Sequence, residues 1–406
     1  MRNNERMIRA LAHPVYRRLF GAQVVALAGT GLATVALGLL AYDLAGAGAG
    51  AVLGTVFAVK MLAYVLVAPV AAVVLARVPR RAVLIGADVL RLLVALTLPF
   101  VGEVWQVVVL VFVLQAASAT FTPTFQSVIP QVLPDEDDYT SALSLSRLAY
   151  DLEAVLSPVL AAALLLVMSS DALFVGTALG FAGSALLVGS VVLPRAVVTV
   201  QAPFRAELRR GAELFVRTAA LRPVLALNLV VAAAGAFVLV QTVVVVRGEL
   251  GLGEGVVALV LAALGAGSMA AALALPRLLR GVAERRVMLG GAVLLTAATA
   301  VIPFALGSLP AVVALWMIVG VGWAAVETPV GRLIRREVPV DGLPAAFAAQ
   351  FSLSHACWLV TYPLAGWLGT VGLGTAAIVL AVVAAAGTVT ATFLWPSRAR
   401  VASLPS

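Results

Sequence analysis

Long apolar stretches separated by short, arginine-rich gaps dominate this sequence and restrict how it can fold. A helix that crosses a bilayer needs about 20 mostly apolar residues. Cutting the chain at charged residues, prolines and glycine-rich turns leaves twelve stretches of that kind: 19–43, 50–76, 82–102, 105–129, 140–167, 172–193, 223–246, 255–275, 287–306, 310–331, 344–368 and 371–395. The sequence therefore predicts an all-α membrane protein with twelve transmembrane helices.

Composition and charge agree with a multi-pass membrane protein. Hydrophobic residues make up 63% and charged residues 11% of the chain, and the mean hydropathy is +1.10. A soluble domain of this length has no core that could bury so much apolar surface. The net charge of +8 does not indicate nucleic-acid binding, because the basic residues flank the apolar stretches. We expect the lipid bilayer to surround the protein, and we expect no nucleic-acid partner.

The basic residues also predict the orientation of the chain. If the helices alternate from a cytoplasmic N-terminus, 23 of the 27 basic residues fall in cytoplasmic segments, as the positive-inside rule requires. Both termini are then cytoplasmic. Residues 1–18 contain five arginines but no obvious cleavage site, so we interpret them as a retained end and not as a signal peptide.

The sequence repeats itself about 205 residues apart. RRAVLIGADVL at 80–90 corresponds to RRVMLGGAVLL at 285–295, and SLSR at 144–147 corresponds to SLSH at 352–355. Two pseudo-symmetric six-helix bundles explain this spacing. The predicted domains are an N-terminal bundle, a basic cytoplasmic linker with a helical pattern, and a C-terminal bundle, at residues 1–193, 194–222 and 223–406.

Several segments in this order resemble the major facilitator superfamily, and within it the drug:proton antiporters that include bacterial macrolide and enterobactin exporters. They are LAHPVYRRLFGAQVVALAGTGLATVALGLLAYDLAG, ARVPRR, FTPTFQSVIPQVLPDEDDYTSALSLSRLAYDLEAVLSPVLAA and LGLGEGVVALVLAALGAGSM. The resemblance implies a monomeric transporter of the bacterial inner membrane that works by alternating access, with a small-molecule substrate and protons as coupling ion. It implies proton-coupled efflux of a small amphipathic molecule. A proton-linked importer, a facilitator, and an uncoupled lipid-handling or receptor-like protein are the alternatives.

The loop after the second predicted helix departs from the family pattern Gly-x-x-x-Asp-Arg-x-x-Arg-Arg. Ala72 and Ala76 replace its glycine and its aspartate. The arginines of the expected cytoplasmic gate therefore lack their usual acidic partner; they are Arg77, Arg80 and Arg81.

Asp88 and Arg91 are the nearest substitute for that partner. They are spaced i, i+3, so they can pair with each other or with the loop. They form either part of the gate or a salt bridge at the end of the helix. A second departure lies at Ser157-Pro158 on helix 5, where antiporters tend to have Gly-Pro; small residues follow, so close helix packing is still expected.

Ionisable residues inside the apolar stretches are the candidate coupling groups, because a charge at membrane depth is costly without a partner. The fifth predicted helix, 140–167, contains Arg147, Asp151 and Glu153. Arg147 and Asp151 are i, i+4 neighbours, whereas Glu153 points to nearly the opposite side. Asp151 or Glu153 is then a proton carrier beside the cation Arg147. The alternative is a structural Arg147–Asp151 pair.

The second half offers a further set of candidates. His355 occupies the position of Arg147 in the repeat, and its imidazole suits proton coupling or substrate binding; a hydrogen-bonded packing role is the alternative. Trp358 and Tyr362, with Trp367, are candidates for an aromatic cavity wall. Glu327 serves either proton coupling and the inward gate or a pair with a loop arginine.

Lys60 is the one lysine of the chain, and it lies inside the second apolar stretch. Its ammonium can extend to the membrane surface, or it can face the cleft and pair with Asp43, Asp151 or Glu153. A lysine suits the second role because it can release its charge during a transport cycle.

Other chemistries find little support. The sequence has no phosphate-binding Gly-x-x-x-x-Gly-Lys-Ser/Thr motif, only two histidines and only one cysteine, Cys357. We therefore predict no enzyme activity, no cofactor, no metal site and no disulfide. DEDD at 135–138 is expected to be a solvated loop. The prolines Pro123, Pro158, Pro329 and Pro363 are expected inside helices, where they produce kinks.

Overall fold

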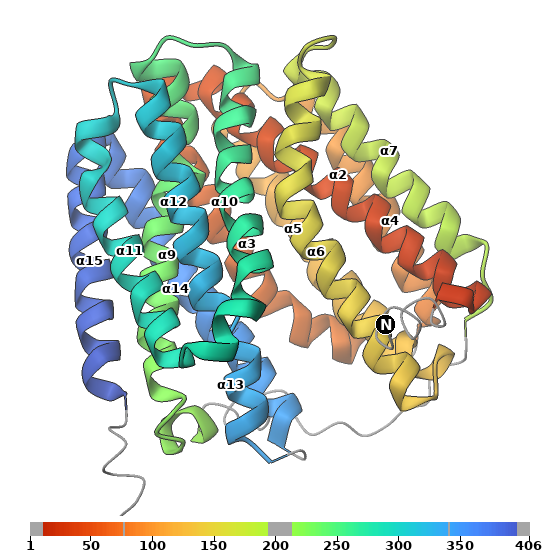
Figure 1. Ribbon diagram of the computed structural model, residues 1–406. Helices are drawn as coiled ribbons and strands as arrows, with labels where there is room; N and C mark the ends of the chain where they lie inside the picture. The colour runs from red at the N-terminus through yellow and green to blue at the C-terminus, as the bar shows by residue number, and fades with distance from the viewer. Residues whose placement is uncertain (1–10, 76–77, 194–212, 340–341, 396–406) are drawn as a thin grey trace, which may run out of the picture. The chain divides into compact units, whose positions relative to one another are not determined.

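A computed structural model describes residues 11–75, 78–193, 213–339 and 342–395, and all of its regular structure is helical (Figure 1). The chain divides into two compact units. Unit 1 comprises Met1–Ala45, Val59–Val200 and Glu254–Leu259, and unit 2 comprises Gly46–Ala58, Gln201–Gly253 and Val260–Ser406. The predicted domain boundaries, including the linker at 194–222, remain a prediction, because residues 194–212 lie outside the described part.

The long helices follow the apolar stretches of the sequence. The first half of the chain forms α2 (Pro14–Ala45), α3 (Ala49–Val74), α4 (Arg80–Thr97), α5 (Val104–Val132), α6 (Glu136–Leu164) and α7 (Ser170–Gly189). The second half forms α9 (Arg222–Val243), α10 (Glu254–Gly281), α11 (Glu284–Ala305), α12 (Leu309–Glu327), α13 (Val330–Glu337), α14 (Leu343–Val371) and α15 (Leu373–Leu394). Short turns at Gly46–Gly48 and Leu98–Phe100 and a π-helical turn at Val244–Glu249 extend α2, α4 and α9.

The helix ends have local causes. Gly46 adopts a positive φ of 51° between α2 and α3, a conformation that glycine reaches without strain. Asp135 caps α6 by accepting a hydrogen bond from the Asp138 backbone N–H at 3.0 Å. The prediction that DEDD at 135–138 is a loop is wrong for its last three residues, which form the first turn of α6 because Asp135 caps it. The prediction that Pro329 lies inside a helix is wrong: α12 ends at Glu327, and Pro329 precedes α13, because a proline cannot continue the backbone ladder.

Apolar length supports a multi-pass membrane protein. Within the described residues, nine helical stretches are long and apolar enough to cross a membrane, and one of them, Pro14–Val67, contains both α2 and α3. Twelve spans and cytoplasmic termini remain predictions; the two ends of the chain lie outside the described residues.

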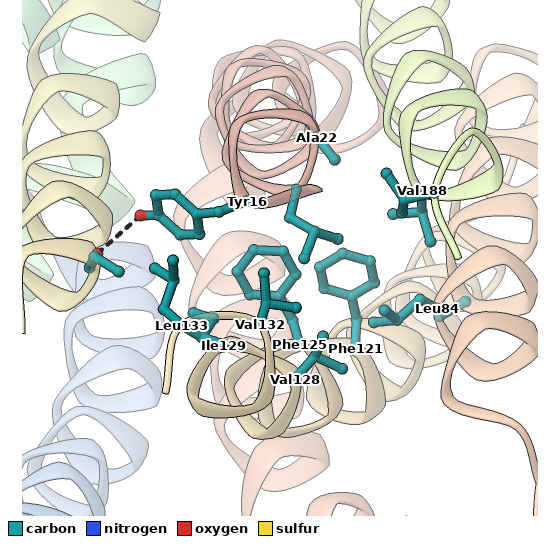
Figure 2. Close-up of a cluster of buried hydrophobic side chains, with 14 of the residues drawn as sticks. Tyr16, Ala22, Leu84, Phe121, Phe125, Val128, Ile129, Val132, Leu133 and Val188 are labelled. Carbon is teal, nitrogen blue, oxygen red and sulfur yellow. Dashed lines mark hydrogen bonds between the residues drawn. The ribbon is translucent and has the colours of Figure 1, made fainter. Parts of the chain in front are cut away.

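The core of unit 1 joins α2 to α5, with α4, α6 and α7 around them (Figure 2). Phe121 and Phe125 stack with ring centroids 5.7 Å apart, and Tyr16 is fully buried beside Ile129. The Tyr16 hydroxyl donates a hydrogen bond to the Ala142 carbonyl oxygen at 3.2 Å, which ties α2 to α6. Burying this hydroxyl without a partner would be costly, so the bond favours the observed packing of α2 against α6.

Unit 2 is built around α9, which is buried along most of its length. The fully buried Trp316 of α12 meets Phe237 edge to face and donates its indole N–H to the Thr242 hydroxyl at 2.8 Å. Elsewhere in the unit α10 and α12 touch backbone to backbone. A Cβ at Gly267 or Gly320 would overlap a carbonyl oxygen of the facing helix, so these positions need glycine.

Candidate functional site

Lys60 and Glu153 form a charged site inside unit 1. Lys60 is on α3 and Glu153 is on α6; both side chains are partly buried, and their charges interact. Among the described side chains, the charge of Glu153 acts on Lys60; the side chain of Asp151 lies outside the described residues. An ammonium and a carboxylate inside an apolar bundle are tolerated because each compensates the other.

Gly31 of α2 makes room for this site. A Cβ at Gly31 would lie 2.7 Å from the Glu153 Oε1 and would overlap the side chain of Ser157. The face of α6 that carries Glu153 and the buried Ser157 therefore packs directly on the α2 backbone. Gly31 was not among the predicted residues, because one glycine among 35 gives no signal of its own.

Polar side chains continue from the charged site between α2, α5 and α6. The Ser146 hydroxyl donates to the Gln23 Oε1 at 2.9 Å. Gln23 is also a hydrogen-bond partner of Tyr150, as is Thr122, and Tyr150 interacts with Glu153. These residues form a polar strip, which we define as Gln23, Thr122, Ser146 and Tyr150. Gln23 could have been found from the sequence, because it is an amide within an apolar stretch.

Asp88 and Arg91 pair with each other in the middle of α4. Both are buried, with 0% and 4% of their surface exposed. Ser184 of α7 donates to the Asp88 Oδ2 at 2.7 Å, and the Arg91 guanidinium lies 4.4 Å from the Phe121 ring centroid and 4.5 Å from that of Phe181. We call these five residues the clamp. It lies within the bundle and not at a helix end.

The loop arginines make separate contacts. The Arg80 guanidinium donates to the Ser127 carbonyl oxygen at 3.1 Å, and Arg81 donates to the Gly189 carbonyl oxygen. Arg77 lies outside the described residues, and so do the side chains of Arg147 and Asp151. The structure thus ties two of the proposed gate arginines to the ends of α5 and α7.

Unit 2 contains a cluster of four aromatic rings, the aromatic cluster. The Trp323 and Trp358 centroids are 5.2 Å apart, those of Trp358 and Tyr362 are 4.9 Å apart, and those of Tyr362 and Phe57 are 5.1 Å apart. A Cβ at Gly235 would be only 2.8 Å from the Trp323 ring and would overlap that of Trp358, so α9 fits closely against both indoles. The sequence analysis missed Trp323 and Phe57, because they come from other helices than Trp358.

The remaining candidates of unit 2 lie in different surroundings. The His355 Nδ1 donates to the Phe351 carbonyl oxygen at 2.7 Å, and the two rings stack. Glu327 is the last residue of α12, partly buried, and its charge acts on Cys357. Trp367 is 62% exposed and does not belong to the aromatic cluster.

Two polar pairs of unit 2 were not foreseen. Asn228 and Gln350 exchange hydrogen bonds of 3.2 and 2.9 Å between α9 and α14. At the start of α11, Glu284 accepts from Arg336 at 2.6 Å and lies 3.3 Å from Arg332. The acid thus holds α13, the short helix that the sequence analysis had not separated from its neighbour.

The described parts of the chain were also compared with the requirements of a metal site. No group of three or more His, Cys, Asp or Glu side chains is gathered there in a way that could hold a metal ion.

Comparison with known proteins identifies the family. Residues 19–282, more than half of the chain, match the Major Facilitator Superfamily, and no curated protein sequence matches. Similar solved structures include the nucleoside transporter NupG, with a TM-score of 0.72, 12% identity and coverage of 95% of this chain and 100% of that one. A bacterial homolog of the human lysosomal transporter Spinster, inward-facing and unoccupied, has a TM-score of 0.72, 13% identity and coverage of 95% and 98%.

A POT family transporter in complex with a thioalcohol-conjugated peptide has a TM-score of 0.69, 13% identity and coverage of 92% and 95%. At these identities the structures show a shared fold, and the family match carries the assignment. The resemblance to the superfamily is therefore confirmed, and it points to a transporter and not to an enzyme. The chain belongs to the major facilitator superfamily.

Proposed function

We propose that this protein is a proton-coupled exporter that moves a small amphipathic molecule by alternating access. The observation that carries the proposal is the charged site of Lys60 and Glu153. Placing an unpaired charge in the middle of a membrane helix costs at least about 2.5 kcal/mol, so packing alone gives no reason to keep two such groups. A carboxylate that can take up and release a proton does give one.

The geometry of the charged site supports an exchange. When the Glu153 carboxylate takes up a proton it loses its charge, and its attraction to the Lys60 ammonium disappears. When the proton leaves, that attraction returns. Tyr150 and the rest of the polar strip adjoin Glu153 and provide hydroxyl and amide groups that can pass a proton. Asp151, Arg147, His355 and Glu327 remain secondary candidates for coupling, and Arg77, Arg80, Arg81, Asp88 and Arg91 for the gate.

The aromatic cluster supports the class of substrate. Trp323, Trp358 and Tyr362 offer flat apolar rings with polar N–H and O–H groups, which suit the apolar part of an amphipathic molecule. Structural neighbours are a nucleoside transporter and a transporter with a bound peptide derivative, so small organic molecules fit this fold. We propose membership of the drug:proton antiporter branch and a location in the bacterial inner membrane.

Proton movement in everted membrane vesicles tests the proposal. Energised vesicles receive a panel of cationic, neutral and anionic compounds, and the pH gradient is followed for the wild type and for Glu153→Gln, Lys60→Met and Asp151→Asn. We expect at least one compound to dissipate the gradient with the wild type, and Glu153→Gln to abolish this response. Comparison with Asp151→Asn decides which acid of α6 carries the proton.

Asp171→Asn is the matched control, since Asp171 is an exposed acid at the start of α7 in the same unit. It should respond as the wild type does. If a compound crosses the membrane but never changes the gradient, coupling is refuted and the protein is a facilitator. If Glu153→Gln couples normally, the charged site is not the proton path.

A further inference from the structure

An open apolar cavity lies between α9 and α15 in unit 2. Its volume is about 380 Å³. Leu225 and Leu229 of α9 line one side, and Ala386 and Leu394 of α15 line the other. Gly387 also lines the cavity and allows α9 and α15 to approach closely, because a Cβ there would lie 2.8 Å from the Val230 Cγ2. The lining of the cavity is therefore mostly apolar.

The surface beside the cavity is apolar as well. Val382, Val389 and Phe393 of α15 are 63%, 53% and 85% exposed. In a multi-pass membrane protein, a helix face of this kind is covered by lipid chains. The cavity thus opens on a surface that we expect acyl chains to contact.

A basic group marks one end of the cavity. Arg222 lines it and is exposed, and its Nε donates to the Val216 carbonyl oxygen at 2.6 Å. That bond uses one of the five guanidinium N–H groups. Arg217, five residues earlier, is exposed as well, and Arg398 and Arg400 follow α15 closely in the sequence.

We propose that this cavity binds an anionic phospholipid, with an acyl chain between α9 and α15 and the phosphate at Arg222. Apolar volume beside an exposed guanidinium matches the two parts of such a lipid. The C-terminal segment 396–406 is a less suitable occupant. It contains two arginines and no acid, so Arg222 would repel it. The site is separate from the proposed transport function.

Lipid retention by the purified full-length protein tests the site. Phosphatidylglycerol or phosphatidylcholine with identical acyl chains is added in detergent, and bound lipid is counted by native mass spectrometry. We expect phosphatidylglycerol to be retained preferentially. Arg222→Gln should lower this preference about fivefold, the effect of one basic residue on an anionic lipid. Ala386→Trp, which fills the cavity, should reduce the binding of both lipids.

Matched controls separate the site from general charge and bulk. Arg280→Gln removes an exposed arginine of α10 that does not line the cavity, and Leu273→Trp adds bulk at an exposed position of the same helix, also outside the cavity. Both should bind lipid as the wild type does, and thermal unfolding midpoints check that all variants are folded. Equal retention of the two lipids by the wild type overturns the proposal. The proposal is also overturned if Arg222→Gln still prefers phosphatidylglycerol as the wild type does, or if inorganic phosphate alone displaces all of the bound phosphatidylglycerol. Lipid binding that requires removal of residues 396–406 would overturn it as well.

Discussion

The repeated stretch of the sequence is fastened differently in the two units. In unit 1, Asp88 and Arg91 of α4 form an ion pair that Ser184 of α7 joins by a hydrogen bond. With the repeat of 205 residues, the equivalent positions of α11 in unit 2 are Val293 and Thr296. Thr296 meets Thr388 of α15, with the two hydroxyl oxygens 3.0 Å apart.

The comparison shows that one structural task has two chemical solutions. Both contacts join the helix after the basic loop to the last helix of its half. The clamp of unit 1 uses two charges and two aromatic rings, whereas unit 2 uses two hydroxyls, and Val293 is 57% exposed. Buried charges are stable only while both partners are present, so the two units should differ sharply in their response to substitution.

The largest effect is expected for Asp88→Ala. It leaves Arg91 charged and buried without its acid, which should lower the free energy of unfolding by about 3–5 kcal/mol. Chemical unfolding of the purified protein in detergent measures this change. Asp171→Ala, at an exposed position of α7, is the control and should change stability little. A loss below about 1 kcal/mol for Asp88→Ala would mean that the pair is not structural.

Transplanting the residues of unit 2 should repair most of that damage. The double variant Asp88→Val with Arg91→Thr removes both charges together, and apolar replacement of a buried ion pair is often neutral. We expect the free energy of unfolding of the double variant to lie within about 2 kcal/mol of the wild-type value. The double variant should therefore be more stable than Asp88→Ala. A double variant that is less stable than the single one would show that Arg91 stabilises unit 1 through Phe121 and Phe181 alone.

A smaller loss is expected in unit 2 for Thr388→Val, which keeps the shape of the side chain and removes its hydroxyl. The bond to Thr296 and that to the Ala384 carbonyl oxygen at 2.9 Å are lost. Each neutral hydrogen bond contributes about 0.5–1.5 kcal/mol, so the loss of two should lower the free energy of unfolding by about 1–3 kcal/mol in the same assay. A loss as large as that of Asp88→Ala would erase the contrast between the units.

The smallest effect is expected at the second basic loop. Glu284→Gln weakens the contacts to Arg332 and Arg336, whose side chains are 56% and 58% exposed. Exposed ion pairs contribute about 0.2–1 kcal/mol and are screened by salt. The difference from the wild type should be measurable at low ionic strength and vanish near 1 M salt. A difference that persists in high salt would contradict an electrostatic origin.

Most of the fold was accessible from the sequence because span-length apolar runs have few alternatives. The predicted stretches 105–129 and 371–395 correspond to α5 and α15. The exception at Pro329 is instructive. The run at 310–331 is apolar across the proline, so hydropathy did not reveal that the helix ends at Glu327. Hydropathy indicates which segments can be buried in lipid. It does not register that proline lacks the backbone N–H needed to continue a helix.

Residues of the candidate site could be predicted only where their residue type is rare in the apolar stretches. Lys60 stood out as a lone lysine, and Glu153 was among the three acids considered for it. Which acid lies beside Lys60 depends on how α3 and α6 pack, and a single sequence does not contain that information. Gly31 and Trp323 escaped notice for the same reason, since glycines and aromatic residues are common in membrane helices and acquire meaning only from what they face.

The clamp also bears on how the chain enters the membrane during synthesis. A lone aspartate or arginine near the centre of a helix opposes insertion by about 2.5–3.5 kcal/mol. Asp88 and Arg91 lie on the same helix, so they can neutralise each other as soon as α4 is helical. Ser184 is translated 96 residues later. The central charges of α4 can therefore be paired when this helix enters the bilayer, long before α7 exists to pack against it.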